Sequence, residues 1–246
     1  MSLHILTINA GSSSLKLALF GVEDSPKKSF EAVIDDIGSP AAAFAATGAK
    51  LPAVNKPVAA PDHQAAARLL TDWLKQVHEG TIDAIGHRIV HGGPKYYEPH
   101  VIDDTVMEDL GKLTLFDPEH LPIELQLIGV FQALYPNATQ TACFDTAFHH
   151  DLPNVARLLP IPRQYAAKGI RRYGFHGVSY AFVLSELERL EGAEVAQGRL
   201  ILAHLGNGVS LTAVHQGKSI DTTMGLTPAS GVPMSSRAGD LDPGLA

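Results

Sequence analysis

Two turns rich in small, hydrogen-bonding residues lie far apart in the chain, at Asn9–Lys16 (NAGSSSLK) and His204–Gly208 (HLGNG). In each, an apolar run stops at these residues and a second apolar run follows, as in two strands joined by a turn. Glycine lets the backbone turn tightly and approach a ligand closely, and converging amides and hydroxyls suit phosphate oxygens. Lys16 adds a positive charge. One such turn alone is usually only a turn, but the pair predicts two related lobes that face one polyphosphate.

Two arginines stand in segments that could bring a guanidinium to an anion. Arg88 lies in an apolar run that ends in glycines, and Arg237 lies in a long loop, 224–244, dense in glycine and proline. A guanidinium can bind a carboxylate or a phosphate through two parallel hydrogen bonds. The alternatives are a surface arginine on an edge strand for Arg88, and a surface ion cluster of Arg237 with Asp240 and Asp242.

An acid and a histidine complete the candidate chemistry. Asp145 follows a buried apolar run, and strand ends are where α/β proteins place their sites. His176 stands between an aromatic residue and a glycine just before a helix, where an imidazole can donate to an anion. The alternatives are an Asx turn or helix cap at Asp145 and a helix-entry histidine without a ligand. The common phosphate-loop, dinucleotide, zinc-protease and serine-hydrolase motifs are absent from the sequence.

Hydrophobic periodicity predicts the elements that must position these groups. Strands are expected at 3–8, 15–20, 30–37, 82–90, 139–144, 199–205, 209–215 and 219–223. Helices are expected at 61–78, 105–113, 122–134 and 178–190. The first helix would bury one face, made of Ala66, Leu69, Leu70, Trp73, Leu74 and Val77. Segment 41–61 is rich in alanine, proline and glycine, and is predicted to be a loop.

The order of these elements predicts the fold class. Three strands followed by helices that alternate with strands are typical of an RNase-H-like α/β lobe. We expect one such lobe at residues 1–147 and the start of a second at 148–246, because the second segment repeats the phosphate-type hairpin and the third strand. The helices and strands that would complete the second lobe are missing, so the sequence is interpreted as part of a longer protein.

Composition bounds the possible partners. The chain has 246 residues, 45% of them hydrophobic, a mean hydropathy of +0.06 and a net charge of −7. A protein with a net negative charge binds nucleic acid or acidic membrane surfaces poorly. For the same reason, an anionic substrate must be held by a local cluster of positively charged groups. Cys143 is the only cysteine, which excludes an intrachain disulfide and a cysteine-based zinc site. We expect a cytoplasmic protein, since the sequence shows neither a membrane span nor a signal peptide.

Taken together, the segments resemble the family of acetate kinases and related short-chain carboxylate kinases. The matching pieces follow the family order, at 9–16, 86–93, 144–149, 173–177, 204–210 and 224–243. The resemblance implies an actin-like fold of two RNase-H-like lobes, of the sugar-kinase superfamily. It also implies transfer of a phosphoryl group between ATP and a short-chain carboxylate, with ATP/ADP and Mg²⁺ as cofactors and a homodimer in the full-length form. Residues 148–246 would begin the nucleotide-binding lobe.

The same resemblance implies roles for single residues. Asn9 would help to place Mg²⁺, Arg88 would hold the carboxylate or the transferring phosphoryl, and His176 and Arg237 would stabilise the transition state. Asp145 would be the catalytic acid/base or an orienting carboxylate. The phosphate-binding residues would be Ser12, Ser14, Lys16, His204, Leu205, Gly206, Asn207 and Gly208. The substrate-binding residues, besides Arg88, would be Val90, His120, Phe175 and Pro228.

Three departures from the family pattern bear on these expectations. Glu119 replaces an apolar pocket residue, Ser235-Ser236 replaces a Gly-Thr pair before Arg237, and Tyr180 stands where a histidine is common. Which short-chain acid is the substrate therefore stays open. The competing hypothesis is a non-catalytic actin-like module for nucleotide binding or assembly. Residues 1–246 alone are expected to lack useful kinase activity.

Overall fold

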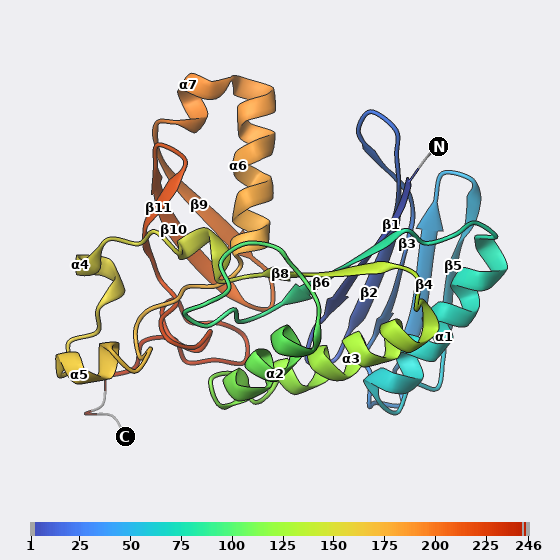
Figure 1. Ribbon diagram of the computed structural model, residues 1–246, viewed down its shortest axis with the longest axis horizontal. Coiled ribbons are helices and arrows are strands. Elements are labelled where there is room, and N and C mark those ends of the chain that lie inside the picture. Colours follow the sequence, from blue (N-terminus) through green and yellow to red (C-terminus); the bar gives the residue numbers. More distant parts are fainter. Residues whose placement is uncertain (1–2, 243, 245–246) are drawn as a thin grey trace. The chain divides into compact units, whose positions relative to one another are not determined.

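The computed structural model describes residues 3–242 and 244 and divides them into two compact units (Figure 1). Unit 1 holds the residues up to Ile89 together with Pro99–Thr114 and Pro118–Cys143. Unit 2 holds Val90–Glu98, Leu115–Asp117 and the residues from Phe144 onward. Each unit is therefore assembled from segments that are not continuous in the sequence. The expected lobes at 1–147 and 148–246 stay a prediction about the complete fold.

Unit 1 is built on a mixed sheet in the order β5-β4-β3-β2-β1-β6-β8-β7. Its strands are β1 (Leu3–Ala10), β2 (Leu15–Val22), β3 (Pro26–Asp35), β4 (Ala43–Gly48), β5 (Leu51–Pro57), β6 (Ala84–Ile89), β7 (His100–Val101) and β8 (Thr139–Phe144). The first five strands form an antiparallel meander, in which Asn9 pairs with Lys16. β6 joins β1 in parallel, with Ile8 opposite His87. This register places Arg88 beside the turn that follows β1.

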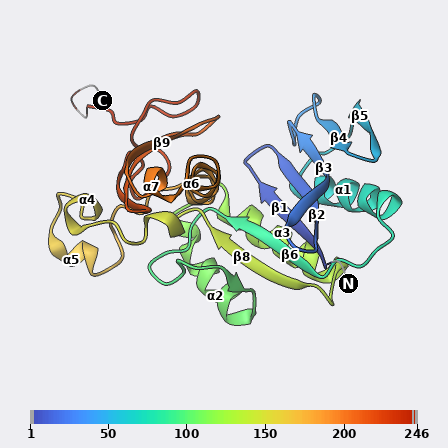
Figure 2. The same cartoon turned by 90° about the horizontal axis from the view of Figure 1, so that it is seen from above.

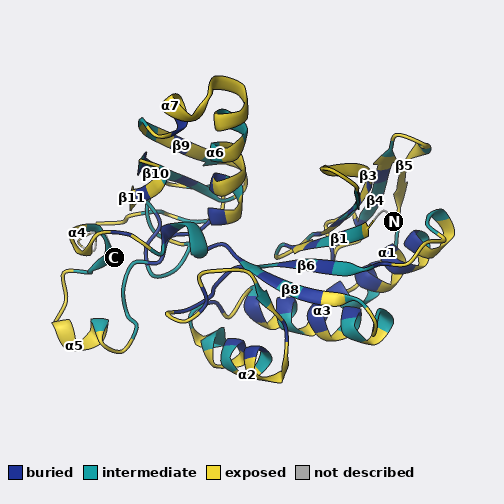
Figure 3. Cartoon of the chain, turned by 45° about the horizontal axis from the view of Figure 1, so that its top comes forward, coloured by how far each residue is buried: buried dark blue, intermediate teal, exposed yellow. Residues whose placement is uncertain are grey.

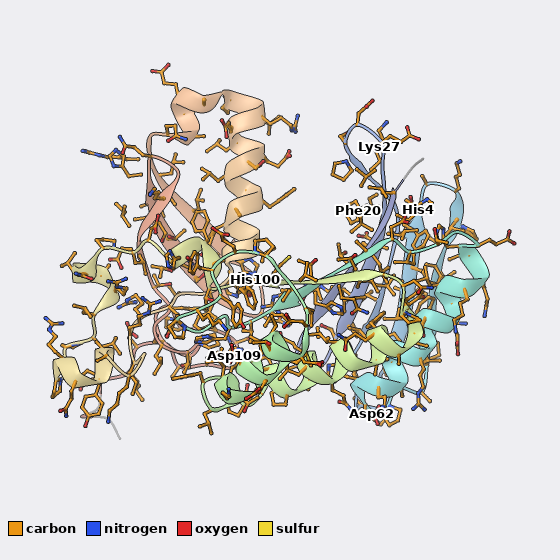
Figure 4. All side chains as sticks on the ribbon, viewed as in Figure 1. His4, Phe20, Lys27, Asp62, His100 and Asp109 are labelled. Carbon is orange, nitrogen blue, oxygen red and sulfur yellow. The ribbon has the colours of Figure 1, made fainter. Side chains whose placement is uncertain are left out.

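Helices cover one face of the unit 1 sheet (Figure 2). They are α1 (His63–Val77), α2 (Asp104–Lys112) and α3 (Leu121–Leu134), and the short 3₁₀ helix η1 (Leu113–Leu115) follows α2. Asp62 caps α1 by accepting from the Ala65 N–H at 2.7 Å, and Figure 4 shows this residue at the start of the helix. α1 packs on β2 and β3, and α3 packs on α1 and β6. Between them lies a continuous apolar core that includes Leu6, Leu70 and Phe131.

Unit 2 is built on an antiparallel sheet in the order β11-β10-β9. Its elements are η2 (Ala147–His149), α4 (Asn154–Arg157), α5 (Arg163–Ala166), α6 (Gly177–Glu191), α7 (Ala193–Ala196), β9 (Arg199–Leu205), β10 (Val209–His215) and β11 (Lys218–Thr222). α6 packs on β9, and Tyr180, Leu202 and Val214 form the small core. Much of α6 is exposed in Figure 3, including Leu190 at 65%. Ile201 and Leu205 on β9 are exposed by 75% and 78%.

The predicted elements agree with the structure within a few residues, with one clear error. Segment 41–61, expected to be a loop, contains the hairpin of β4 and β5, because β4 completes its backbone hydrogen bonds along β3. Phe44 and Ala46 of β4 are buried in the core. The expected buried face of α1 is wrong at Leu69, which is 37% exposed. Among the described residues, no helix is long and apolar enough to cross a membrane.

Candidate functional site

The first predicted turn joins β1 to β2 in unit 1. The Gly11 N–H donates to the Ser14 carbonyl at 2.8 Å, which closes the turn and leaves Ser12 exposed. His63, the first residue of α1, donates through Nε2 to the Gly11 carbonyl at 2.8 Å. Asn9 and Lys16 also line a hollow of about 500 Å³ on the sheet. The hydrogen bond from the buried His63 thus holds the turn in place, while Ser12 stays exposed.

Arg88 lies beside this turn, as the parallel register of β6 and β1 requires. Its Nη1 donates to the Ala10 carbonyl at 3.1 Å and lies 3.5 Å from the Asn9 Oδ1. Unit 1 therefore places Arg88 beside Asn9 and the start of the turn, and the roles expected of these residues stay predictions. His120 of the same unit immediately precedes α3 and is half-buried.

A second cluster lies in unit 2 around His176. This residue is the N-cap of α6 and adopts a left-handed backbone conformation, with φ of 62°. Its ring stacks on that of His204, with 4.0 Å between the ring centroids. His176 Nδ1 is 2.8 Å from Ser210 Oγ, and His204 Nδ1 is 3.0 Å from Ser179 Oγ. Helix α6 and the β9–β10 hairpin thus hold the two imidazoles in fixed orientations.

The second predicted turn, 206–208, and Arg237 belong to the same cluster. A Cβ atom on Gly208 would lie 3.0 Å from His176 Nε2 and 3.6 Å from Arg237 Nη1. Only a residue without a side chain leaves this space open. Leu205, Gly206 and Asn207 are exposed, and the Gly206 N–H donates to the Gly208 carbonyl at 3.1 Å. The imidazole edge and the guanidinium therefore meet at a glycine turn, a combination suited to phosphate oxygens.

The loop that carries Arg237 has internal hydrogen bonds of its own. Arg237 Nη1 donates to the Pro228 carbonyl at 3.1 Å. Asp240 accepts from the Gly231 N–H through its carboxylate, and its own N–H donates to the Gly231 carbonyl, both at 2.8 Å. Asp240 therefore closes the loop through one side-chain and one backbone hydrogen bond. This arrangement favours a positioned Arg237 over the surface ion cluster that the sequence left open.

Asp145 is buried at the end of β8, with 2% exposure. Its backbone carbonyl accepts from the Gly177 N–H at 2.8 Å, next to His176. A Cβ on Gly177 would lie 2.3 Å from that carbonyl, so glycine is required for the close approach. The strand end is thus joined to the start of α6.

The apolar residues predicted for the substrate are also in unit 2. Val90 and Phe175 are 3% and 1% exposed, whereas Pro228 is half-buried. The His91 ring lies edge-on to Phe175, with 5.7 Å between the centroids, and at 4.5 Å from Tyr173. Phe175 is thus buried beside aromatic rings.

His149 is a site residue that sequence reasoning missed. Its Nε2 donates to the Phe175 carbonyl at 3.0 Å, and its Nδ1 lies 2.8 Å from Ser219 Oγ. Burial lowers the pKa of His149 to about 4, although the Phe175 carbonyl and the charge of Asp145 act in the opposite direction. A neutral His149 therefore anchors the turn that presents His176. Ser179, Tyr180, Ser210 and His63 were missed as well, because such contacts join distant segments and leave no spacing pattern.

Burial of three histidines makes the stability depend on pH. Burial lowers the pKa of His87, His91 and His149 to about 4, whereas unfolded histidine titrates near 6.5. Between these values the unfolded chain binds more protons, so the free energy of unfolding should fall as the pH drops from 6.5 toward 4. We expect a loss of about 1–2 kcal/mol per histidine between pH 7.5 and 5.

Urea unfolding at the two pH values measures this effect. The substitution His149→Gln should reduce the difference between them. A free energy of unfolding that is the same at pH 7.5 and pH 5 would contradict the prediction.

Asn9, next to the β1–β2 turn, carries a side-chain oxygen of the kind that hard metal ions bind. Among the residues that the structure describes, no three His, Cys, Asp or Glu side chains are grouped to hold a metal ion. Mg²⁺ is commonly held by one or two protein oxygens together with phosphate oxygens and waters. Asn9 Oδ1 fits as one such oxygen for an ion that arrives with a nucleotide.

Comparison with known proteins shows the fold and the family of the chain. The fold is the actin-like ATPase fold, a mixed α/β architecture. The model of the acetokinase family matches residues 4–246, so the chain belongs to that family. It is 40% identical over 251 residues to an acetate kinase from Clostridium kluyveri, covering 99% of this chain and 61% of the relative.

Solved structures give the same result. A propionate kinase from Francisella tularensis superimposes with a TM-score of 0.88 at 33% identity, over 99% of this chain and 62% of that one. An acetate kinase from Porphyromonas gingivalis gives a TM-score of 0.83 at 32% identity, with the same coverage. The chain thus spans about three-fifths of the length of these relatives, from 61% to 62%.

Proposed function

We propose that the protein transfers the γ-phosphoryl group of ATP reversibly to the carboxylate of acetate or a similar short-chain acid, giving ADP and an acyl phosphate. Membership of the acetokinase family supports this function. The main structural observation in support of this function is the cluster of His176 and Arg237 at the Gly208 turn. An imidazole and a guanidinium beside a glycine, which has no side chain, can bind a phosphoryl group and its developing charge.

The chemistry assigned to each residue follows from the reaction. In-line phosphoryl transfer needs positioning and positive charge around the equatorial oxygens, with little covalent chemistry from the protein. Arg237 and His176 supply donors in unit 2, and Arg88 supplies a guanidinium in unit 1. A carboxylate nucleophile is already ionised at pH 7. Asp145 is therefore proposed to orient neighbouring groups and not to remove a proton.

Each of the two glycine-containing turns is proposed to bind phosphate groups. Their small residues are Ser12, Ser14, Gly206, Asn207 and Gly208, with Lys16, His204 and Leu205 adjoining them. Mg²⁺ bound with ATP would neutralise phosphate charge, and Asn9 would contribute an oxygen to it. Val90, Phe175 and Pro228 are proposed to hold the short alkyl part of the acid, with His120 as a further substrate contact.

Further proposals concern the complete protein and the activity of residues 1–246 alone. The complete protein is proposed to be cytoplasmic and to form a homodimer. Sedimentation analysis would test whether it is a dimer. The preferred acid stays undecided, since Glu119 replaces an apolar residue of the family pattern. Residues 1–246 alone are proposed to be inactive, because the relatives carry a further part of the chain.

An acid panel tests the proposed function. The protein expressed from its complete reading frame is incubated with ATP, Mg²⁺ and acetate, propionate, butyrate or formate, and acyl phosphate is trapped as the hydroxamate. We expect acid-dependent product with a preference for one short acid, and none from residues 1–246. Absence of hydroxamate with every acid would contradict the function. Equal turnover by residues 1–246 would contradict the proposal that they are inactive alone.

A further inference from the structure

We propose that Tyr180 and Ser210 form a hydroxyl relay that fixes the tautomer and the direction of the His176 imidazole. This inference rests on the proposed function only in its kinetic consequence. Tyr180 and Ser210 would act through His176, which makes them positioning residues for phosphoryl transfer.

The three groups form one chain of contacts inside unit 2. The Tyr180 hydroxyl is hydrogen-bonded to Ser210 Oγ, and Ser210 Oγ lies 2.8 Å from His176 Nδ1. Tyr180 and Ser210 are 1% and 0% exposed, so water does not compete for these contacts. Tyr180 lies one helical turn after His176, and its N–H donates to the His176 carbonyl at 3.0 Å. This backbone hydrogen bond fixes the position of Tyr180 relative to His176, the two ends of the relay.

The direction of the protons follows from counting donors and acceptors. Burial raises the pKa of Tyr180, so the phenol keeps its proton; contacts with Ser210 and the backbone of His204 oppose this effect. The Tyr180 hydroxyl is hydrogen-bonded to Ser210 and can donate to it. Ser210 in turn donates to His176 Nδ1. Every hydroxyl proton has an acceptor in this arrangement.

The opposite direction leaves a buried group unsatisfied. If His176 Nδ1 carried the proton and donated to Ser210, the Ser210 and Tyr180 hydroxyls would have only each other as acceptors. Among the described residues, one of these two hydroxyl protons would then have no acceptor. An unsatisfied buried donor is costly, so the structure favours Nδ1 as the acceptor.

This tautomer has a functional consequence. With Nδ1 as the acceptor, a neutral His176 carries its proton on Nε2. The Nε2 edge is the one that faces the Gly208 turn, where a Cβ would lie 3.0 Å away. The relay therefore turns His176 into an N–H donor aimed at the position proposed for the phosphoryl oxygens.

A double-mutant cycle in the complete protein tests the relay by kinetics. Ser210→Ala should lower kcat about tenfold, and Tyr180→Phe somewhat less, with small changes in KM. In the Ser210→Ala background, Tyr180→Phe should have almost no further effect, because its influence passes through Ser210. Tyr165→Phe is the control, since that tyrosine lies in α5 of the same unit and is 37% exposed. Additive losses in the cycle, or a Tyr165→Phe loss as large as that of Tyr180→Phe, would overturn the proposal.

A second experiment, by NMR spectroscopy, does not depend on the enzymatic activity. Ring ¹⁵N shifts of labelled histidine, assigned by comparison with His176→Asn, report which nitrogen carries the proton. We expect the Nε2–H form in the wild type and a shift toward a mixture in Ser210→Ala. A wild-type Nδ1–H form would overturn the relay even in an active enzyme. A protein that makes no acyl phosphate but shows the Nε2–H form would instead contradict only the proposed function.

Discussion

Replacing Arg237 by alanine in the complete protein is expected to lower kcat by ~10² or more, with a smaller change in the KM for ATP. Arg237 reaches the Gly208 turn beside His176, and its loop is closed by hydrogen bonds. A positioned guanidinium interacts most strongly with charge that develops in the transition state. The loss should therefore appear mainly in kcat.

Steady-state kinetics by the hydroxamate assay would measure this effect. Arg163→Ala is the matched control, because Arg163 is an exposed arginine of the same unit, in α5. We expect this control to keep normal turnover. Near-normal turnover of Arg237→Ala would refute the role assigned to Arg237.

Replacing Arg88 by alanine is the second change with a large expected effect, again ~10² or more in kcat. Arg88 lies at the β1–β2 turn, where it donates to the Ala10 carbonyl and contacts Asn9. Arg88→Lys should remain impaired, because an ammonium group cannot bind a carboxylate or a phosphate through a planar two-pronged contact.

The control for Arg88 is Arg68→Ala, which removes an exposed arginine from α1 of the same unit. Thermal unfolding of each variant separates loss of catalysis from loss of folding. If Arg88→Ala unfolds at the wild-type temperature and turns over at the wild-type rate, Arg88 is no part of the machinery.

The sequence predicted the fold best where periodicity was strong. β8, β9 and β10 have the expected bounds, because short runs rich in apolar and β-branched residues, bounded by turn residues, indicate strands. The β4–β5 hairpin was missed because its alanine-rich sequence has weak strand propensity. Pairing of β4 with the edge of β3 decides its structure. The residues of β4 do not by themselves show this pairing.

The charged and glycine residues of the candidate site could be predicted from the sequence. The residues that hold them in position could not. Arg88, His176 and Arg237 stand beside recognisable turns, so the sequence predicted them. Ser210 and His149 hold these groups through contacts between distant segments. A single serine or histidine inside an apolar run carries no signal of such a contact. The supports therefore became visible only with the tertiary structure.

The most direct test of the proposed phosphoryl transfer is ³¹P NMR of the complete protein with ATP, Mg²⁺ and the preferred acid. The account predicts that an acyl phosphate signal grows in step with ADP, and that neither grows when the acid is left out. Binding of ATP without turnover, as in a non-catalytic nucleotide-binding or assembly module, would contradict it. Release of inorganic phosphate at a rate independent of the acid would contradict it as well.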